Sequence, residues 1–270
     1  MTKHSGRRVF ITGGSSGIGL ALARSLVAQG AHVAIAARGA EQLERARAEL
    51  AAEARGDQRV EAFVLDVSDR VAVSAVSAAV LEALGGIDLL VNNAGITHPG
   101  YAWELDDEVF ERMVQVNYLG TVWVTRAFLP VLMEQRSGQV VNVSSIAGLM
   151  GVFGYTAYGA SKFAVSGFTE SLRQELKPHG VGVSLLCPPD TDTPQLAYEE
   201  DLKPVETKAL AGTVKPMSAQ AVAQAMLDGV AAGRPVIIPG MDGWVTVWLA
   251  RHFPWLARWV MDRMIRKARA

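Results

Sequence analysis

The chain has 270 residues, half of them hydrophobic and 20% charged, and its formal net charge is −1. This size and composition predict a single globular domain, and the near-neutral charge argues against a nucleic-acid binder. The one cysteine, Cys187, excludes an internal disulfide and a thiolate metal cluster, and no histidine spacing indicates a metal site. The N-terminus lacks the apolar stretch of a secretory signal, and no apolar run reaches the about 18 residues of a membrane span, so we expect a cytoplasmic protein.

Short apolar runs rich in β-branched residues alternate with longer helical patterns along the chain. Runs that are apolar throughout are typical of strands buried on both faces. The predicted strands are 8–12, 32–37, 60–65, 88–91, 139–143, 181–187 and 235–238. The predicted helices are 17–29, one that ends near 54, 68–84, 106–115, 118–135, 158–176 and 218–232.

This alternation predicts an α/β fold with right-handed crossovers. We expect a single-domain Rossmann fold over residues 1–240, with a doubly wound parallel β-sheet of about seven strands flanked by helices. Residues 188–216 show no clear periodicity, and loops of this length inside a domain are usually functional, so we predict a substrate loop there. Residues 241–270 form a predicted amphipathic helical tail.

The first predicted strand runs into the glycine-rich loop Thr12-Gly13-Gly14-Ser15-Ser16-Gly17-Ile18-Gly19, where the first helix begins. Glycines let backbone N–H groups approach a pyrophosphate, and the helix N-terminus favours the anion. A glycine-rich turn without a ligand is the alternative. The strand–loop–helix context favours a dinucleotide site, with contacts from Gly13, Ser15, Ser16, Gly17, Ile18 and Gly19. No Gly-Lys-Ser/Thr run follows the loop, which argues against a P-loop hydrolase.

The spacing T-G-x-x-x-G-x-G resembles that of the short-chain dehydrogenases, and the resemblance extends over residues 6–240. Arg38 ends the second strand, where NAD-binding folds place an acid for the ribose 2′-hydroxyl. An arginine instead suits a 2′-phosphate, so we predict NADPH as cofactor, with NADP⁺ as product. A solvated arginine at a strand end is the alternative. The resemblance implies that Asp66, with Val67 beside it, contacts the adenine. It also implies that Asn93-Ala94-Gly95 lines the cofactor groove and braces the sheet, although the same residues favour a plain turn.

Tyr158 and Lys162 are spaced i, i+4 and therefore share one face of a predicted helix. A nearby ammonium favours the phenolate, so we expect Lys162 to lower the pKa of Tyr158 and make it an effective proton donor or acceptor. Lys162 would also hold the nicotinamide ribose. Such a pair can arise by chance. The resemblance implies that Ser145 orients the substrate carbonyl and that Asn117 supports a proton-relay water beside Lys162; Ser144 is the alternative to Ser145.

The segment Pro188-Pro189-Asp190-Thr191-Asp192-Thr193 follows the sixth predicted strand and resembles the family's P-G-x-x-x-T motif. The resemblance implies that Pro188, Thr191 and Thr193 bind the nicotinamide end of the cofactor, the two threonines through its carboxamide. Pro189 stands where the family has glycine, which stiffens the turn and removes a backbone donor.

Residues 187–216, which include Glu199-Glu200 and Lys203-Pro204-Val205-Glu206-Thr207, resemble one branch of the family, the 3-ketodihydrosphingosine reductases. This resemblance implies NADPH-dependent reduction of a lipid ketone with Tyr158 as proton donor, and the wider family implies a homodimer or homotetramer. The alternatives are a reductase for another apolar ketone, such as a steroid, retinoid or fatty-acyl derivative, and a non-catalytic NADPH-binding regulator. The intact set of Tyr158, Lys162, Ser145 and Asn117 argues against a regulator.

Residues 244–270 hold four of the six tryptophans, six basic residues and one acid. On a continuous helical wheel the four tryptophans fall within about 60° of one another. Tryptophan mixed with Arg and Lys is typical of a helix lying in a membrane interface, so we expect peripheral contact with the cytoplasmic face of a membrane. Pro254 predicts a division into two short helices. A helical arm that packs on a partner subunit is the alternative.

Overall fold

A seven-stranded parallel sheet forms the centre of the computed structural model, which describes residues 4–212 and 215–269. Residues 1–3, 213–214 and 270, which belong to the predicted domain, loop and tail, lie outside the described residues. The strand order is β3 (Val60–Val64), β2 (His32–Ala37), β1 (Arg8–Thr12), β4 (Leu89–Asn92), β5 (Gln139–Val143), β6 (Gly182–Leu186) and β9 (Val236–Ile237). The order reverses between β1 and β4, which is the topological switch point of a doubly wound sheet. The predicted fold class is confirmed.

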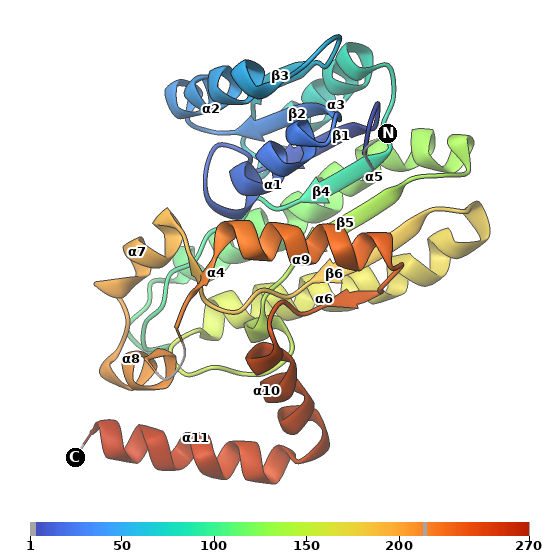
Figure 1. The fold of residues 1–270 in the computed structure, drawn as a ribbon. Helices are drawn as coiled ribbons and strands as arrows, with labels where there is room; N and C mark the ends of the chain where they lie inside the picture. The colour runs from blue at the N-terminus through green and yellow to red at the C-terminus, as the bar shows by residue number, and fades with distance from the viewer. Residues whose placement is uncertain (1–3, 213–214, 270) are drawn as a thin grey trace.

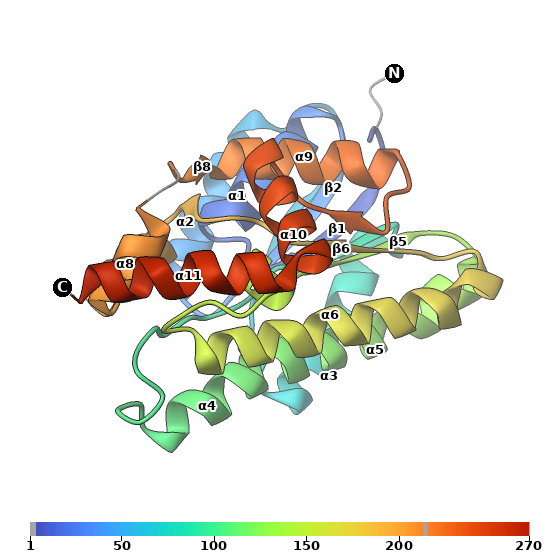
Figure 2. The same ribbon diagram turned by 90° about the horizontal axis from the view of Figure 1, so that it is seen from below.

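Helices cover both faces of the sheet (Figures 1 and 2). One layer holds α1 (Gly17–Ala28), α2 (Ala40–Glu53) and α9 (Ala219–Ala231), and the other holds α3 (Arg70–Leu84), α5 (Gly120–Gln135) and α6 (Thr156–Leu176). The apolar runs of the strands are buried between the layers, as their lack of alternation predicts. The rings of Phe10 on β1 and Phe128 on α5, for example, lie 5.3 Å apart with neither side chain exposed.

A chain of buried amide and hydroxyl groups ties the centre of the sheet to two helices. Asn92 Nδ2 donates to Thr125 Oγ1 and to Asn142 Oδ1, both at 2.8 Å, and Asn142 Nδ2 donates to Thr169 Oγ1 at 2.9 Å. These bonds join β4, β5, α5 and α6. They fix the carboxyl ends of β4 and β5, after which Asn93 and Ser144 follow in the chain.

The helix predicted over 106–115 and the one predicted over 118–135 form one continuous helical segment, which corrects the predicted gap. α4 (Asp107–Met113) passes through a π-helical turn, Val114–Leu119, into α5. The extra residue of a π turn changes which side chains face the sheet, and such turns are frequent at functional sites.

The prediction of a loop over 188–216 is wrong for much of its length. The structure has a short strand β7 (Thr191–Asp192), then α7 (Pro194–Glu200) and α8 (Val205–Ala211), and β7 pairs with β8 (Met217–Ser218). Thr193 Oγ1 accepts a hydrogen bond from Leu196 N and so caps α7, with Pro194 at its first position. Both helices have seven residues, too few to show a helical period in the sequence.

The tail consists of α10 (Met241–His252) and α11 (Pro254–Ala268), with the predicted break at Pro254. α11 packs against α8 and α10, so the tail folds back over the ends of the strands (Figure 1). Because the chain changes direction at Pro254, a single helical wheel does not describe the four tryptophans. Among residues 4–212 and 215–269, no helix combines the length and apolar character needed to cross a membrane.

Candidate active site

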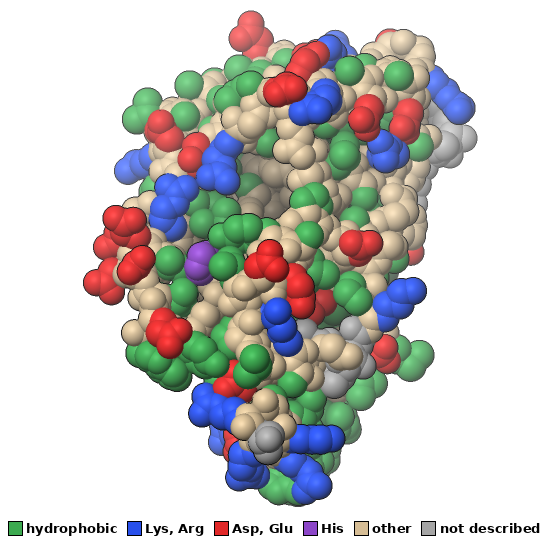
Figure 3. All heavy atoms as spheres, turned by 90° about the vertical axis from the view of Figure 1, so that its left-hand side faces the viewer, with side chains coloured by type: hydrophobic (Ala, Val, Ile, Leu, Met, Phe, Trp, Pro, Cys, Tyr) green, Lys and Arg blue, Asp and Glu red, His purple; other side chains and the backbone are tan. Residues whose placement is uncertain are grey.

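A cavity of about 1110 Å³ opens at the carboxyl ends of the central strands. It runs from the glycine-rich loop to the inner faces of α10 and α11, and Figure 3 shows the hollow from one side. All the predicted site residues line it except Gly19 and Asn117, which lie just behind its wall. The topology therefore gathers residues that are far apart in the sequence, because parallel strands end at the same edge of the sheet.

The glycine-rich loop fits a pyrophosphate. No side chain caps the first turn of α1, so its backbone N–H groups are available at the cavity. Gly13 has a φ of +68°, and a Cβ atom at Gly19 would collide with the carbonyl oxygen of Gly13. Asn93 Nδ2 donates to the Thr12 and Gly13 carbonyls at 3.1 and 3.0 Å, which is the bracing that the sequence predicts. Within the described residues, no group of His, Cys, Asp and Glu is placed to hold a metal ion.

The groups predicted for the adenosine end of the cofactor lie at the rim of the same cavity. Arg38 is exposed there and makes no ion pair among the described residues. Asp66 Oδ1 accepts hydrogen bonds from Ser68 N at 2.9 Å and from Ser68 Oγ at 2.6 Å, which fixes the carboxylate. An unpaired guanidinium beside an ordered carboxylate suits a phosphorylated ribose next to an adenine ring.

Lys162 is deeply buried at the end of β5. Its side chain comes from α6, the residue is 4% exposed, and Nζ donates to the carbonyl of Val143 at 2.9 Å. Nζ also lies 5.7 Å from the centre of the Tyr158 ring. Burial disfavours the charged form and lowers the pKa of Lys162 to about 8.

The expected lowering of the Tyr158 pKa is wrong for this structure. Burial raises the pKa of the Tyr158 hydroxyl, the Ser145 hydroxyl opposes this through a hydrogen bond, and the carboxylates of Glu199 and Asp190 raise it further. Desolvation is the largest of these effects. The structure holds Tyr158 firmly protonated, as a proton donor requires.

Asn117 occupies the π-helical turn and is fully buried. Its amide donates to the Ile96 carbonyl at 3.0 Å and to Ser161 Oγ at 2.9 Å, and its Oδ1 accepts from Ile96 N at 2.8 Å. A Cβ atom added at Gly95 would lie 3.2 Å from both Asn117 Oδ1 and Lys162 Nζ. The two side chains therefore converge on the space that a side chain at position 95 would fill.

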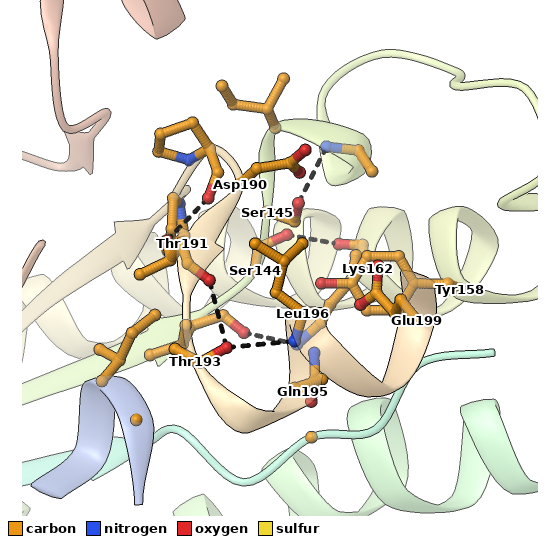
Figure 4. Close-up of a pocket in the computed structure, with 18 of the residues that line it drawn as sticks. Ser144, Ser145, Tyr158, Lys162, Asp190, Thr191, Thr193, Gln195, Leu196 and Glu199 are labelled. Carbon is orange, nitrogen blue, oxygen red and sulfur yellow. Dashed lines mark hydrogen bonds between the residues drawn. The ribbon is translucent and has the colours of Figure 1, made fainter. Parts of the chain in front are cut away.

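The structure distinguishes the two serines at the end of β5. Ser144 is buried, and its hydroxyl is engaged with the Lys162 carbonyl at 2.9 Å and with Ser166 Oγ at 3.0 Å. Ser145 Oγ accepts from Ala147 N at 3.1 Å (Figure 4), and its hydroxyl is near enough to that of Tyr158 to lower the Tyr158 pKa. Ser145 is therefore the serine placed to share a substrate oxygen with Tyr158, as the spacing favours.

The segment after β6 closes the cavity below the glycine-rich loop. Pro188, Thr191 and Thr193 all line it, and a Cβ atom at Gly17 would lie 3.1 Å from Thr193 Cγ2. Thr191 Oγ1 donates to the Pro189 carbonyl at 2.8 Å, so Pro189 has a structural use in spite of its missing N–H. The predicted threonines are thus in reach of a ligand that lies along the loop.

The sequence assigns no role to three groups that the structure places beside Tyr158. Tyr155 donates its hydroxyl to Glu199 Oε2 at 2.5 Å, and the centres of the Tyr155 and Tyr158 rings lie 5.7 Å apart. Asp190 lines the same side of the cavity. Burial raises the pKa values of Glu199 and Asp190. The only signal in the sequence was that Glu199 and Asp190 fall in the segment predicted to set substrate choice.

The fold agrees with comparisons to known proteins. The sequence model of the family described as short chain dehydrogenase matches residues 7–203. The 3-ketodihydrosphingosine reductase of Bos taurus is 40% identical over 242 residues, 89% of this chain and 73% of that protein. The 3-dehydrosphinganine reductase of Danio rerio is 39% identical over 245 residues, which are 90% of this chain and 74% of that protein. A crystal structure of a short chain dehydrogenase/reductase from Burkholderia phymatum in complex with NAD matches with a TM-score of 0.84 and 30% sequence identity. The match covers 95% of this chain and 96% of that one.

The chain therefore belongs to the short-chain dehydrogenase family. It is an oxidoreductase that acts on a ketone or alcohol group.

The pKa of Lys162 predicts a fall in activity on the alkaline side. We expect Lys162 to hold ribose oxygens and to pass protons in its charged form, which it has below its pKa of about 8. We expect kcat/KM for the cofactor, which reports groups of the free enzyme, to be flat below this value and to fall as pH rises through it. Lys162→Arg should be slower but should lack this fall, because arginine stays charged. The same alkaline fall in both proteins, measured between pH 6.5 and 10, would rule out Lys162 as its source.

Proposed function

We propose that this chain reduces 3-ketodihydrosphingosine to dihydrosphingosine with NADPH. The observation that carries the proposal is one cavity in which Tyr158, Ser145 and Lys162 stand at the inner end and apolar side chains of the tail form the outer wall. The similarity to reductases named for this reaction in cattle and zebrafish supports it.

The proton chemistry follows from the buried pair. When bound, the nicotinamide ring would supply a hydride to the ketone carbon. Ser145 and Tyr158 would hydrogen-bond the ketone oxygen, and Tyr158, held protonated by burial, would give its proton as negative charge develops there. Lys162 would hold the ribose hydroxyls from the other side and, with Asn117 across Gly95, would return a proton to Tyr158. A residue that moves protons benefits from a pKa near neutrality, as Lys162 has.

The outer part of the cavity suits a long alkyl chain. α10 and α11 turn an apolar face toward it, made of Leu249, Leu256, Ala257, Val260, Met261 and Met264. Methionine and leucine side chains adapt to an irregular chain and remove it from water, at about 0.8 kcal/mol for each buried CH₂. A small polar ketone would gain nothing from this wall, whereas a lipid ketone would.

Oxidation of NADPH by the purified protein tests the proposal. We expect turnover with 3-ketosphinganine and little with a panel of steroid, retinoid and β-ketoacyl ketones, because only the first combines a long chain with a small polar end. Tyr158→Phe should lower kcat by on the order of 1,000-fold, since it removes the proton donor. Turnover only of other ketones would reject the lipid substrate, and a fully active Tyr158→Phe would reject the proton donor.

The preference for NADPH rests on Arg38. Its guanidinium lies at the cavity rim just after β2, and it can bond a 2′-phosphate in a bidentate manner. Asp66, just after the neighbouring β3, is fixed by its bonds to Ser68, and we assign it to the adenine.

We predict that Arg38→Asp exchanges the cofactors. It removes the cation for the 2′-phosphate and supplies an acceptor for a ribose hydroxyl, so kcat/KM should fall on the order of 100-fold with NADPH and rise with NADH. Arg45→Asp is the matched control, because Arg45 is an exposed arginine on the nearby α2. An unchanged NADPH preference in Arg38→Asp would show that another group reads the phosphate.

We propose further that the tail rests on a membrane with anionic lipids. The outer faces of its helices carry Trp244, Trp248, Trp255 and Trp259, which are 40–67% exposed. On α11, Trp255 and Trp259 point away from the cavity-lining face, with Arg266 between them on the wheel and Arg263 5.8 Å from the Trp259 ring. Figure 3 shows Lys and Arg side chains gathered around the end of the tail. Such a surface would receive a lipid substrate directly into the cavity.

Replacing Trp255 and Trp259 together by serine should weaken sedimentation with vesicles that contain phosphatidylserine, because each indole buries a large apolar area in the interface. Neither side chain lines the cavity, so turnover of detergent-dispersed substrate should persist. Val71→Ser, at an 80% exposed position on the distant α3, is the control. Equal sedimentation of the two variants would assign the tryptophans to a subunit contact instead.

The oligomeric state and the cellular compartment of the protein are predictions from the sequence. We expect a homodimer or homotetramer in the cytoplasm, bound to the cytoplasmic face of a membrane when lipid is present. Light scattering of the purified protein measures the first, and fractionation of cells measures the second.

A further inference from the structure

Two carboxylates that the proton chemistry does not use lie beside Tyr158. Glu199 is 7% exposed on α7, and Asp190 stands in the turn before it, on the wall that carries Ser145 (Figure 4). Glu199 accepts the hydrogen bond of Tyr155, whose ring centre lies 5.7 Å from that of Tyr158, and both carboxylates raise the pKa of the Tyr158 hydroxyl. Asp190 is exposed to the cavity, but Glu199 is buried, and a buried carboxylate is unfavourable unless something compensates its charge.

Within the described residues, neither carboxylate forms an ion pair. Lys203, whose side chain is 3% exposed, lowers the pKa of both carboxyl groups, but its Nζ forms its ion pair with the exposed Glu200, at 3.3 Å. Asp190 and Glu199 also repel each other. This end of the cavity therefore has a surplus of negative charge next to the reacting centre, which a cationic group on a ligand would offset.

The hydrogen-bonding groups around Glu199 also suit a ligand with several donors. Tyr155 occupies Oε2 of the carboxylate. Thr97 is 4% exposed and lies near enough to Glu199 for its hydroxyl to lower the pKa of that carboxyl group. An ammonium group carries three donors, and carboxylate and hydroxyl oxygens are the acceptors that it needs.

We propose that Glu199, with Asp190 beside it, binds the ammonium group of the substrate and so selects α-amino ketones. The inference rests on the proposed function: in 3-ketodihydrosphingosine the carbon next to the ketone carries the amino group. A ketone oxygen held by Tyr158 and Ser145 leaves this amino group one carbon away, on the side of the two carboxylates. The alkyl chain leaves the ketone on its other side, toward the apolar wall of the tail.

Binding of the cation would also prepare the proton donor. The charges of Glu199 and Asp190 oppose ionisation of Tyr158 in the free protein, and a bound ammonium would offset them. Tyr158 would then release its proton more readily once the correct substrate is in place. The same contact would therefore act on both KM and kcat.

Parallel kinetics with two ketones test the inference: 3-ketosphinganine and 1-hydroxyoctadecan-3-one, which differ only by the amino group. Wild-type protein should favour the amine. In Glu199→Gln, kcat/KM should fall on the order of 100-fold for the amine and by no more than about threefold for the neutral ketone, because only the charge pair is lost. Asp190→Asn, at a less buried site, should show the same selectivity with a smaller loss. Asp201→Asn removes one exposed charge near α7 and should change neither substrate.

Three other results would overturn the inference, and they separate a failure of ammonium recognition from a failure of the proposed lipid substrate. Equal losses on both ketones in Glu199→Gln, with NADPH binding and melting temperature unchanged, would mean that Glu199 acts only through Tyr155 and Tyr158. Equal use of both ketones by the wild type would reject ammonium recognition but keep a long-chain ketone as substrate. Turnover of neither long-chain ketone, with activity on other ketones, would reject the proposed function itself.

Discussion

The burial of an ammonium group at the end of β5 is the constraint on which the site depends. Lys162 Nζ has one backbone carbonyl, that of Val143, as its acceptor, and burial leaves it only weakly basic. The position is held because β5 and α6 are joined through Asn142 and Thr169, while Asn117 Oδ1 and Lys162 Nζ share the space left open at Gly95. A ligand that brings hydroxyl oxygens to Nζ would relieve the cost of this burial, so cofactor binding and activation of the site are coupled.

Opposing electrostatic effects set the working state of Tyr158. Desolvation and the two nearby carboxylates keep the hydroxyl protonated, and the Ser145 hydroxyl opposes them. This balance suits a reductase, in which the tyrosine must hold a proton until charge develops on the substrate oxygen. The two carboxylates also make the ends of the cavity differ, with negative charge at the inner end and apolar surface at the tail. An amphipathic substrate with a cationic end fits in one orientation only.

Much of the fold and site could be predicted because the signals are local. The strands are apolar runs, the glycine-rich loop has its own spacing, and Tyr158 and Lys162 share a helix face. The π turn at Asn117, the short helices α7 and α8, and the Tyr155–Glu199 contact depend on tertiary packing that no local pattern records. The direction of the Tyr158 pKa shift was missed for the same reason: the sequence shows a lysine nearby but not the depth of burial. The tail was predicted to be helical, yet nothing in it showed that its inner face lines the cavity.

The ionisation of Tyr158 in the ligand-free protein tests the central claim, that the site stores a proton for reduction. Protein labelled at tyrosine Cζ with ¹³C gives one resonance per tyrosine, and Tyr158→Phe assigns the relevant one. The chemical shift of Tyr158 should stay that of a neutral phenol as pH rises past about 10, the ordinary tyrosine pKa. A transition well below that pH would show that Lys162 outweighs burial, and the stored-proton account would be wrong.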